Sequence, residues 1–128
     1  ATLRFSIRGV WMAIRAGHVL RPDHAKKQTE VAILDSLRWA SGAITRQKRG
    51  EEYPAPFGDF QHARSVAVED IFVEFLPEDD DTKPRGIGEL PYLTIPGAVA
   101  AAVTQASNHY VDAVPITPEL LHGYEESE

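Results

Sequence analysis

One carboxylate of the sequence has neighbours that could adapt it to proton transfer. Glu89 follows Gly86-Ile87-Gly88 and precedes Leu90-Pro91. The two glycines allow a backbone with positive φ and a close approach to another group. A carboxylate held on such a turn, before an apolar helix, could be a buried general base with a raised pKa. The same tetrapeptide also occurs in ordinary surface loops, so the pattern alone does not distinguish a catalytic from a structural turn.

The other reactive residue types form no second site in the sequence. The five histidines are scattered and the chain has no cysteine, so we expect no metal held by protein ligands alone. No serine occupies a nucleophile elbow. Gly86-Ile87-Gly88 lacks the third glycine of a dinucleotide-binding fingerprint. Gln28 and Glu30 are polar residues on a predicted helix, and such residues usually lie on its solvated face.

Length and charge limit the domain count and the partners. A chain of 128 residues can build one hydrophobic core but hardly two, which favours a single domain. The formal charge of −6, with acids clustered at 78–81 and 125–128 and no dense basic patch, argues against a nucleic acid partner. No apolar run approaches the roughly 20 residues of a membrane span.

The pattern of apolar residues predicts an α+β fold with about three strands and two main helices. Alternation predicts strands at 2–8 and 65–76, with 10–14 continuing or pairing with the first, and a short extended piece at 111–116. A helix should begin near Pro22 and run to about residue 44, with an end or kink at Ser41-Gly42. A second helix should begin at Pro96.

The two predicted helices differ in their apolar residues. The first carries a wide apolar face, which we expect in the core, formed by Val31, Ile33, Leu34, Leu37 and Trp39. The second, at 96–107, consists mostly of alanine, valine and glycine and has little polarity for its length. Small side chains allow close packing against another backbone, so this helix should lie inside a larger body.

The order of several motifs resembles the end of the molybdopterin-binding subunit in the xanthine dehydrogenase and aldehyde oxidase family. The isoquinoline oxidoreductases and bacterial aldehyde dehydrogenases of that family are the most similar. The resemblance runs through most of the chain, and its matching segments are Gly17 to Asp23, Gln28-Thr29-Glu30, Gly42 to Gly50, Gly86 to Pro91 and Val114 to Leu121. The sequence departs from the family pattern at Arg15, Arg21 and Val31 and has Leu90 where a proline is usual.

The resemblance implies a role for four residues and a set of partners. Glu89 would be the base beside molybdenum in the hydroxylation of an aldehyde or an N-heterocycle with water as oxygen source. Gln28, Gly86 and Gly88 would contact the molybdopterin cofactor. Residues 1–128 would form one segment, the C-terminal part of a larger molybdopterin-binding subunit.

Such an enzyme would also need an iron–sulfur subunit with 2Fe–2S clusters, and a flavin or haem on a flavin or cytochrome c subunit. A periplasmic or membrane-associated complex would be favoured over a cytoplasmic one. The alternative is a non-catalytic α+β interaction or scaffold subunit, in which the turn before Glu89 is purely structural.

Overall fold

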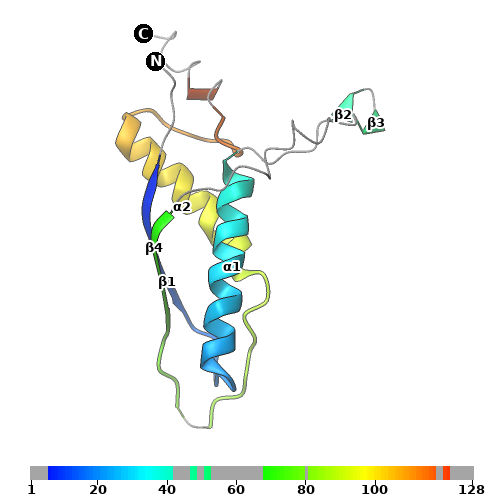
Figure 1. The fold of residues 1–128 in the computed structure, drawn as a ribbon, viewed down its shortest axis with the longest axis vertical. Helices are drawn as coiled ribbons and strands as arrows, with labels where there is room; N and C mark the ends of the chain where they lie inside the picture. Colours follow the sequence, from blue (N-terminus) through cyan, green and yellow to red (C-terminus); the bar gives the residue numbers. More distant parts are fainter. Residues whose placement is uncertain are drawn as a thin grey trace.

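The computed structural model of the chain describes residues 6–41, 47–48, 51–52, 68–79, 81–117 and 120–121. Its elements are β1 (Ile7–Ile14), α1 (Pro22–Ala40), β2 (Gln47–Lys48), β3 (Glu51–Glu52), β4 (Val68–Phe75) and α2 (Leu90–Ser107). Two long helices accompany a pair of long strands (Figure 1). The predicted α+β class is therefore confirmed.

The two long strands form a parallel pair. β1 lies beside β4, with Val10 opposite Ile71 and Ile14 opposite Phe75. The strand continues through Gly9, and the indole ring of Trp11 lies so close to this residue that a Cβ there would come within 2.5 Å of the ring. β2 and β3 form a separate antiparallel pair of two residues each, which the sequence did not indicate.

The short extended piece predicted at 111–116 contains bends and pairs with no strand in the described part of the chain. Two of its residues are still buried: Val111 and Ile116 join the core, and the Ile116 amide donates to the Ala40 carbonyl oxygen at 2.7 Å. The segment is thus held by the end of α1 rather than by a sheet.

α1 begins with Pro22 in its first turn, as predicted, and ends at Ala40. Its buried face contains Ile33, Leu37 and Ala40, which are spaced by four and three residues. The expected burial of Trp39 and Val31 is wrong, because Trp39 is 47% and Val31 58% exposed. Each lies two positions from a core residue, which is more than half a turn away around the helix.

α2 begins at Leu90, six residues before the predicted start. Pro96 lies inside the helix, where proline usually costs about 3 kcal/mol because it lacks an amide donor. Here Pro91 and Pro96 are both buried on the face that packs into the core, and that burial offsets part of the cost. As a result, the helix starts directly after Glu89 and makes that residue its N-cap.

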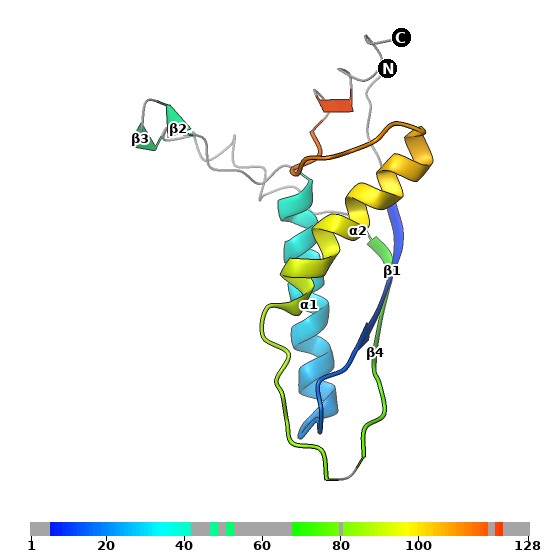
Figure 2. The same cartoon turned by 180° about the vertical axis from the view of Figure 1, so that it is seen from behind.

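One hydrophobic core joins the strands to the helices. It contains Ile14 and Val73 from the strands, Ile33 and Leu37 from α1, and Val99 with its neighbours from α2. α1 and α2 pack against each other, and α1 also contacts β4 (Figure 2). Within the described ranges, neither helix is both long and apolar enough to cross a membrane.

Candidate functional site

The segment that leads to Glu89 is anchored on the turn between β1 and α1. The Arg85 amide donates to the Ala16 carbonyl oxygen at 2.9 Å. Gly17 has a φ of 69°, and a Cβ there would collide with the carbonyl oxygen of Lys83. The close backbone approach of this region therefore occurs at Gly17, because only glycine combines this φ with this contact.

The two glycines before Glu89 have the predicted backbone. Gly86 and Gly88 have φ values of 78° and 52°, which confirms the expected left-handed conformation. The expected close packing of these glycines is wrong within this chain, since a Cβ at either position would meet nothing within 4 Å. Their backbone faces open space that a group from outside the chain could approach.

Glu89 is exposed at the N-terminus of α2. Its carbonyl oxygen accepts from the Leu93 amide at 3.3 Å, whereas its side chain caps no amide of the helix. The expectation of a buried carboxylate is therefore wrong for the chain alone. The physical reason is the early helix start, which places Glu89 outside the helix while Pro91 turns into the core.

A polar cluster lies one turn into α2. The Tyr92 hydroxyl donates to Asp35 Oδ2 at 3.2 Å, and Arg38 Nη1 donates to Asp35 Oδ1 at 2.7 Å. Partial burial raises the pKa of Tyr92, and the charge of Asp35 and its hydrogen bond act in the same direction. The charge of Glu89 makes the smallest contribution to this rise in the pKa of Tyr92. No pattern in the sequence indicated Tyr92, although it lies three residues after Glu89 and therefore on the same side of the chain as that carboxylate.

Gln28 is exposed on the side of α1 that carries this cluster. Gln28, Val31 and Asp35 are spaced by three and four residues, so they share one face of the helix. Gln28 and Asp35 lie two turns apart, or about 10 Å along the axis. Since Asp35 contacts Tyr92, the structure places Gln28 and the Glu89 end of α2 on the same side of α1. Val31 leaves an exposed apolar side chain on that face.

Arg15, one of the positions where the sequence departs from the family pattern, pairs with a carboxylate of the acidic run at 78–81. Arg15 Nε lies 3.5 Å from Glu78 Oε1, and the Glu78 side chain is only 15% exposed. Glu78 is thus less exposed than acidic residues in such runs usually are. This pair fixes the chain that leaves β4 against the end of β1, several residues before the Glu89 turn.

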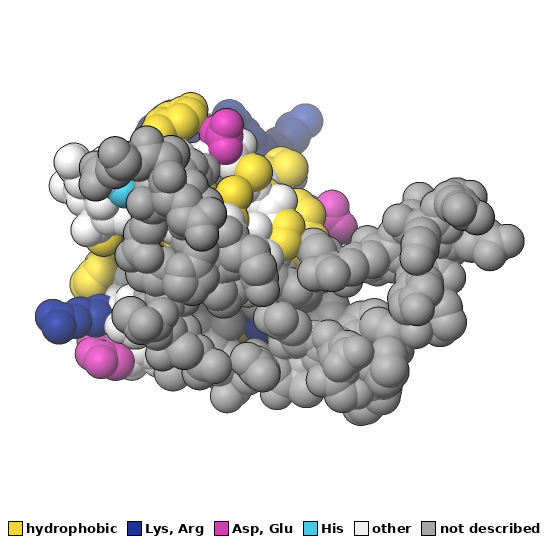
Figure 3. All heavy atoms as spheres, turned by 90° about the horizontal axis from the view of Figure 1, so that it is seen from above, with side chains coloured by type: hydrophobic (Ala, Val, Ile, Leu, Met, Phe, Trp, Pro, Cys, Tyr) yellow, Lys and Arg dark blue, Asp and Glu magenta, His cyan; other side chains and the backbone are white. Residues whose placement is uncertain are grey.

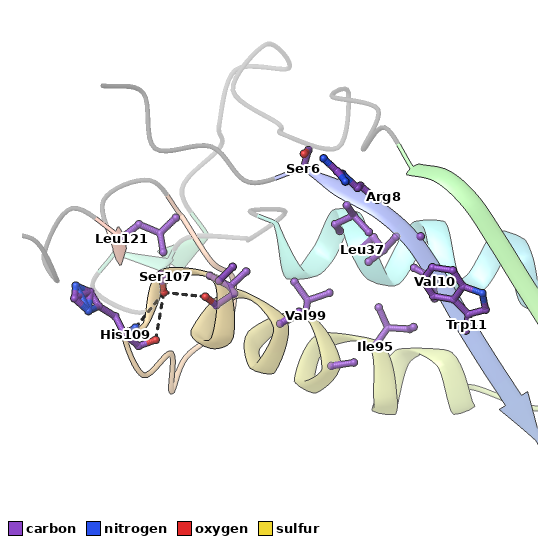
Figure 4. A pocket seen from close by; sticks show the side chains of 16 residues that line it. Ser6, Arg8, Val10, Trp11, Leu37, Ile95, Val99, Ser107, His109 and Leu121 are labelled. Atoms are coloured by element: carbon purple, nitrogen blue, oxygen red, sulfur yellow. Dashed lines mark hydrogen bonds between the residues drawn. The ribbon is translucent and has the colours of Figure 1, made fainter.

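A cavity of about 780 Å³ lies elsewhere, between β1 and α2. In Figure 4, Ile95 and Val99 point from α2 toward the strand that carries Val10 and Trp11. The lining is mainly apolar and contains neither Glu89 nor Gln28. This cavity and the predicted chemistry therefore occupy different places on α2. Among the described residues, no three histidine or carboxylate side chains gather as a metal site.

Several large apolar side chains reach the surface. In the view from above, hydrophobic atoms appear among the charged ones (Figure 3). The most exposed of these residues, each with more than 70% of its surface accessible, are Trp11, Leu20, Leu93 and Tyr110. Trp11 stacks on Phe72 across the two strands, with ring centroids 5.7 Å apart. Large contiguous apolar patches mark surfaces that another polypeptide covers, and the stacked pair of Trp11 and Phe72 is the part of this set shown to be contiguous.

The chain has a relative among characterised proteins. It is 31% identical over 112 residues, or 86% of its length, to a protein of Gluconacetobacter polyoxogenes described as a membrane-bound aldehyde dehydrogenase (pyrroloquinoline-quinone). The chain spans 14% of the length of that relative. No family model matches the chain. The comparison thus shows similarity to a segment of an aldehyde dehydrogenase.

Proposed function

We propose that this chain is part of a larger oxidoreductase that oxidises aldehydes or N-heterocycles, with Glu89 as its general base. The observation that carries the proposal is the similarity of most of the chain to a small segment of an aldehyde dehydrogenase. The exposed apolar side chains support it, since a partial domain leaves surfaces that the rest of the protein covers. A periplasmic or membrane-associated location belongs to the same proposal.

Molybdopterin is the cofactor that the motif order supports, and the geometry is compatible with it. Gly86 and Gly88 leave open space over their backbone, and Gln28 presents an exposed amide on the side of α1 that faces the start of α2. These are groups that could hold a polar ring system, with the rest of the site on other segments. When bound, the molybdenum cofactor would supply the two-electron oxidation that converts an aldehyde and water into a carboxylic acid.

Within that reaction, Glu89 would accept a proton from the attacking water. Its carboxylate caps no helix amide and forms no side-chain hydrogen bond in the described part of the chain. A general base of this kind contributes roughly 100- to 10,000-fold to the rate. Covering the exposed Glu89 by the rest of the protein would exclude water and strengthen its interactions with the reacting groups. An iron–sulfur subunit, with a flavin or cytochrome subunit beyond it, would carry the electrons away.

A second candidate differs in the cofactor. The printed description of the relative names pyrroloquinoline quinone. A quinone of this type would also accept two electrons from an aldehyde, and Glu89 could still serve as the base. The non-catalytic alternative is an interaction or scaffold subunit, in which the Gly86–Glu89 turn only connects β4 to α2.

The test is a metal and quinone analysis of the native assembly, followed by one substitution. We expect a particle much larger than 14.2 kDa that contains molybdenum and iron. Quinone without molybdenum would support the second candidate, and a particle with neither would favour the scaffold.

The variant Glu89→Gln should assemble with unchanged metal content but lose at least 100-fold in kcat. Glu69→Gln, which removes an exposed carboxylate on β4, is the matched control and should keep full activity. Normal turnover of Glu89→Gln would refute the catalytic assignment.

A further inference from the structure

The helical layer of the chain is wider than its sheet. Two neighbouring strands cover roughly 10 Å, because strands are spaced by about 4.8 Å. Two packed helices cover roughly 18 to 20 Å, because their axes lie 8–10 Å apart and each helix is about 10 Å wide. α1 packs against both α2 and β4, and a cavity separates α2 from β1. The difference in width corresponds to one or two additional strands.

The hollow between β1 and α2 lies where such a strand would pack. Its lining on the helix comes from one face, with spacings of three and four residues, formed by Ile95, Ala98, Val99, Ala102, Val103 and Ala106. Its lining on the strand comes from residues 6–11. The volume of about 780 Å³ is lined mainly by apolar side chains. A strand with alternating apolar side chains would fill it with those side chains.

The backbone of β1 can accept a further strand. The Leu76 amide donates to the Ile14 carbonyl oxygen at 2.8 Å, so the polar groups of Ile14 point toward β4. Strand geometry alternates, and the groups of Met12 and Val10 therefore point the same way. The amides and carbonyls of Gly9, Trp11 and Ala13 point to the opposite edge. In the described part of the chain, β1 pairs with β4 alone, so no strand occupies that edge.

A two-stranded parallel sheet is unusual. Parallel sheets occur almost only with both faces covered, and most sheets have about four to six strands. Here the sheet has two strands, and its outer face carries Trp11 and Phe72, which are 72% and 51% exposed. The missing strand has a source if the chain is a segment of a longer protein, since the chain spans 14% of its relative.

We propose that a β-strand from the polypeptide outside this chain pairs with the open edge of β1. Its backbone bonds the polar groups of Gly9, Trp11 and Ala13, and its inward apolar side chains occupy the hollow over α2. The source of the strand, the remainder of the large oxidoreductase polypeptide, rests on the proposed function. The sheet extension itself rests on the width, the hollow and the open edge.

Hydrogen exchange in the native assembly tests the pairing, with residue resolution from fragmentation mass spectrometry. Val10 and Met12 amides, bonded to β4, provide the internal reference. We expect Gly9, Trp11 and Ala13 to exchange within about tenfold of that reference, as amides of a central strand do. Exchange a hundredfold or more faster would overturn the proposal. So would a protected edge in a particle made only of copies of this chain, because the added strand would then come from a second copy.

A pair of substitutions tests the hollow. Ala101 and Ala102 are adjacent and exposed, and only Ala102 lines the cavity. Ala102→Trp should weaken co-purification with the rest of the assembly at least tenfold, and Ala101→Trp should weaken it less. Equal effects would contradict docking in the hollow.

The exchange result is independent of the proposed function. An assembly without molybdenum but with protected edge amides would refute the chemistry and support the sheet extension. An assembly that contains molybdenum but whose edge amides exchange fast would support the chemistry and refute the sheet extension.

Discussion

The anchoring of the Glu89 segment at Gly17 gives the sharpest stability prediction. Gly17 and Gly86 share a left-handed backbone, with φ values of 69° and 78°. A Cβ at Gly17 would collide with the Lys83 carbonyl oxygen, whereas a Cβ at Gly86 would meet nothing within 4 Å. The two alanine variants therefore differ in the collision alone.

The magnitudes follow from two contributions. The left-handed conformation costs an alanine about 1–2 kcal/mol at either site. At Gly17 the collision also moves the 83–85 backbone and breaks the hydrogen bond from the Arg85 amide to the Ala16 carbonyl, which is worth about 0.5–1.5 kcal/mol. Gly17→Ala should thus lower the free energy of unfolding by about 1 kcal/mol more than Gly86→Ala.

Urea unfolding of the 128-residue chain, followed by far-ultraviolet circular dichroism, measures this difference. With a slope of about 1.5 kcal/mol per molar urea, the midpoint of Gly17→Ala should lie about 0.7 M below that of Gly86→Ala. Equal midpoints would refute the close packing of the Glu89 segment on this turn. A larger loss for Gly86→Ala would show that Gly86, rather than Gly17, holds the segment.

Two further stability predictions follow from the burial and the hydrogen bonds. Leu37→Ala should lower the free energy of unfolding by about 2–5 kcal/mol, because the Leu37 side chain is fully buried between the helices and the sheet. Val31→Ala, on the exposed face of α1, should change it by no more than about 0.5 kcal/mol in the same unfolding assay. The bond from Tyr92 to Asp35 requires the protonated phenol, and the pKa of Tyr92 is raised above 10.0 in the folded chain. The contribution of this hydrogen bond to stability is therefore fully present below pH 10 and is lost as the pH rises through the folded-state pKa. The difference in the free energy of unfolding between the wild type and Tyr92→Phe should thus shrink above pH 10. A difference that is constant from pH 8 to 11.5 would contradict this.

The fold class was predictable because the strongest periodic patterns lie in elements that bury one face. The alternation of Ile71, Val73 and Phe75 predicted β4, and Pro22 predicted the start of α1. The start of α2 was placed six residues late, because proline is usually confined to the first turn of a helix. Of the two prolines in α2, only Pro91 lies in the first turn, as that preference expects. Pro96 lies inside the helix, and the burial of both prolines in the core outweighs the preference.

The sequence predicted the backbone conformation of the candidate site but not which residues surround Glu89. Two glycines around one residue indicate positive φ from local sterics, and both angles were confirmed. Burial of Glu89 depends on contacts between distant segments, which a single sequence does not specify. Tyr92 and Asp35 meet although they lie 57 residues apart, and neither position carries a local pattern that would reveal the contact.

The exposed Glu89 and the open edge of β1 have one physical explanation. A base works best where water is excluded, and the open edge of a sheet is usually paired, covered or blunted in native proteins. The chain meets neither condition alone: Glu89 is exposed and the β1 edge is unpaired in the part that the structure describes. Both sites border α2, one at its N-terminus and one along its cavity-lining face. A polypeptide that packs along α2 could therefore cover both, so completing the fold and forming the site would be one event.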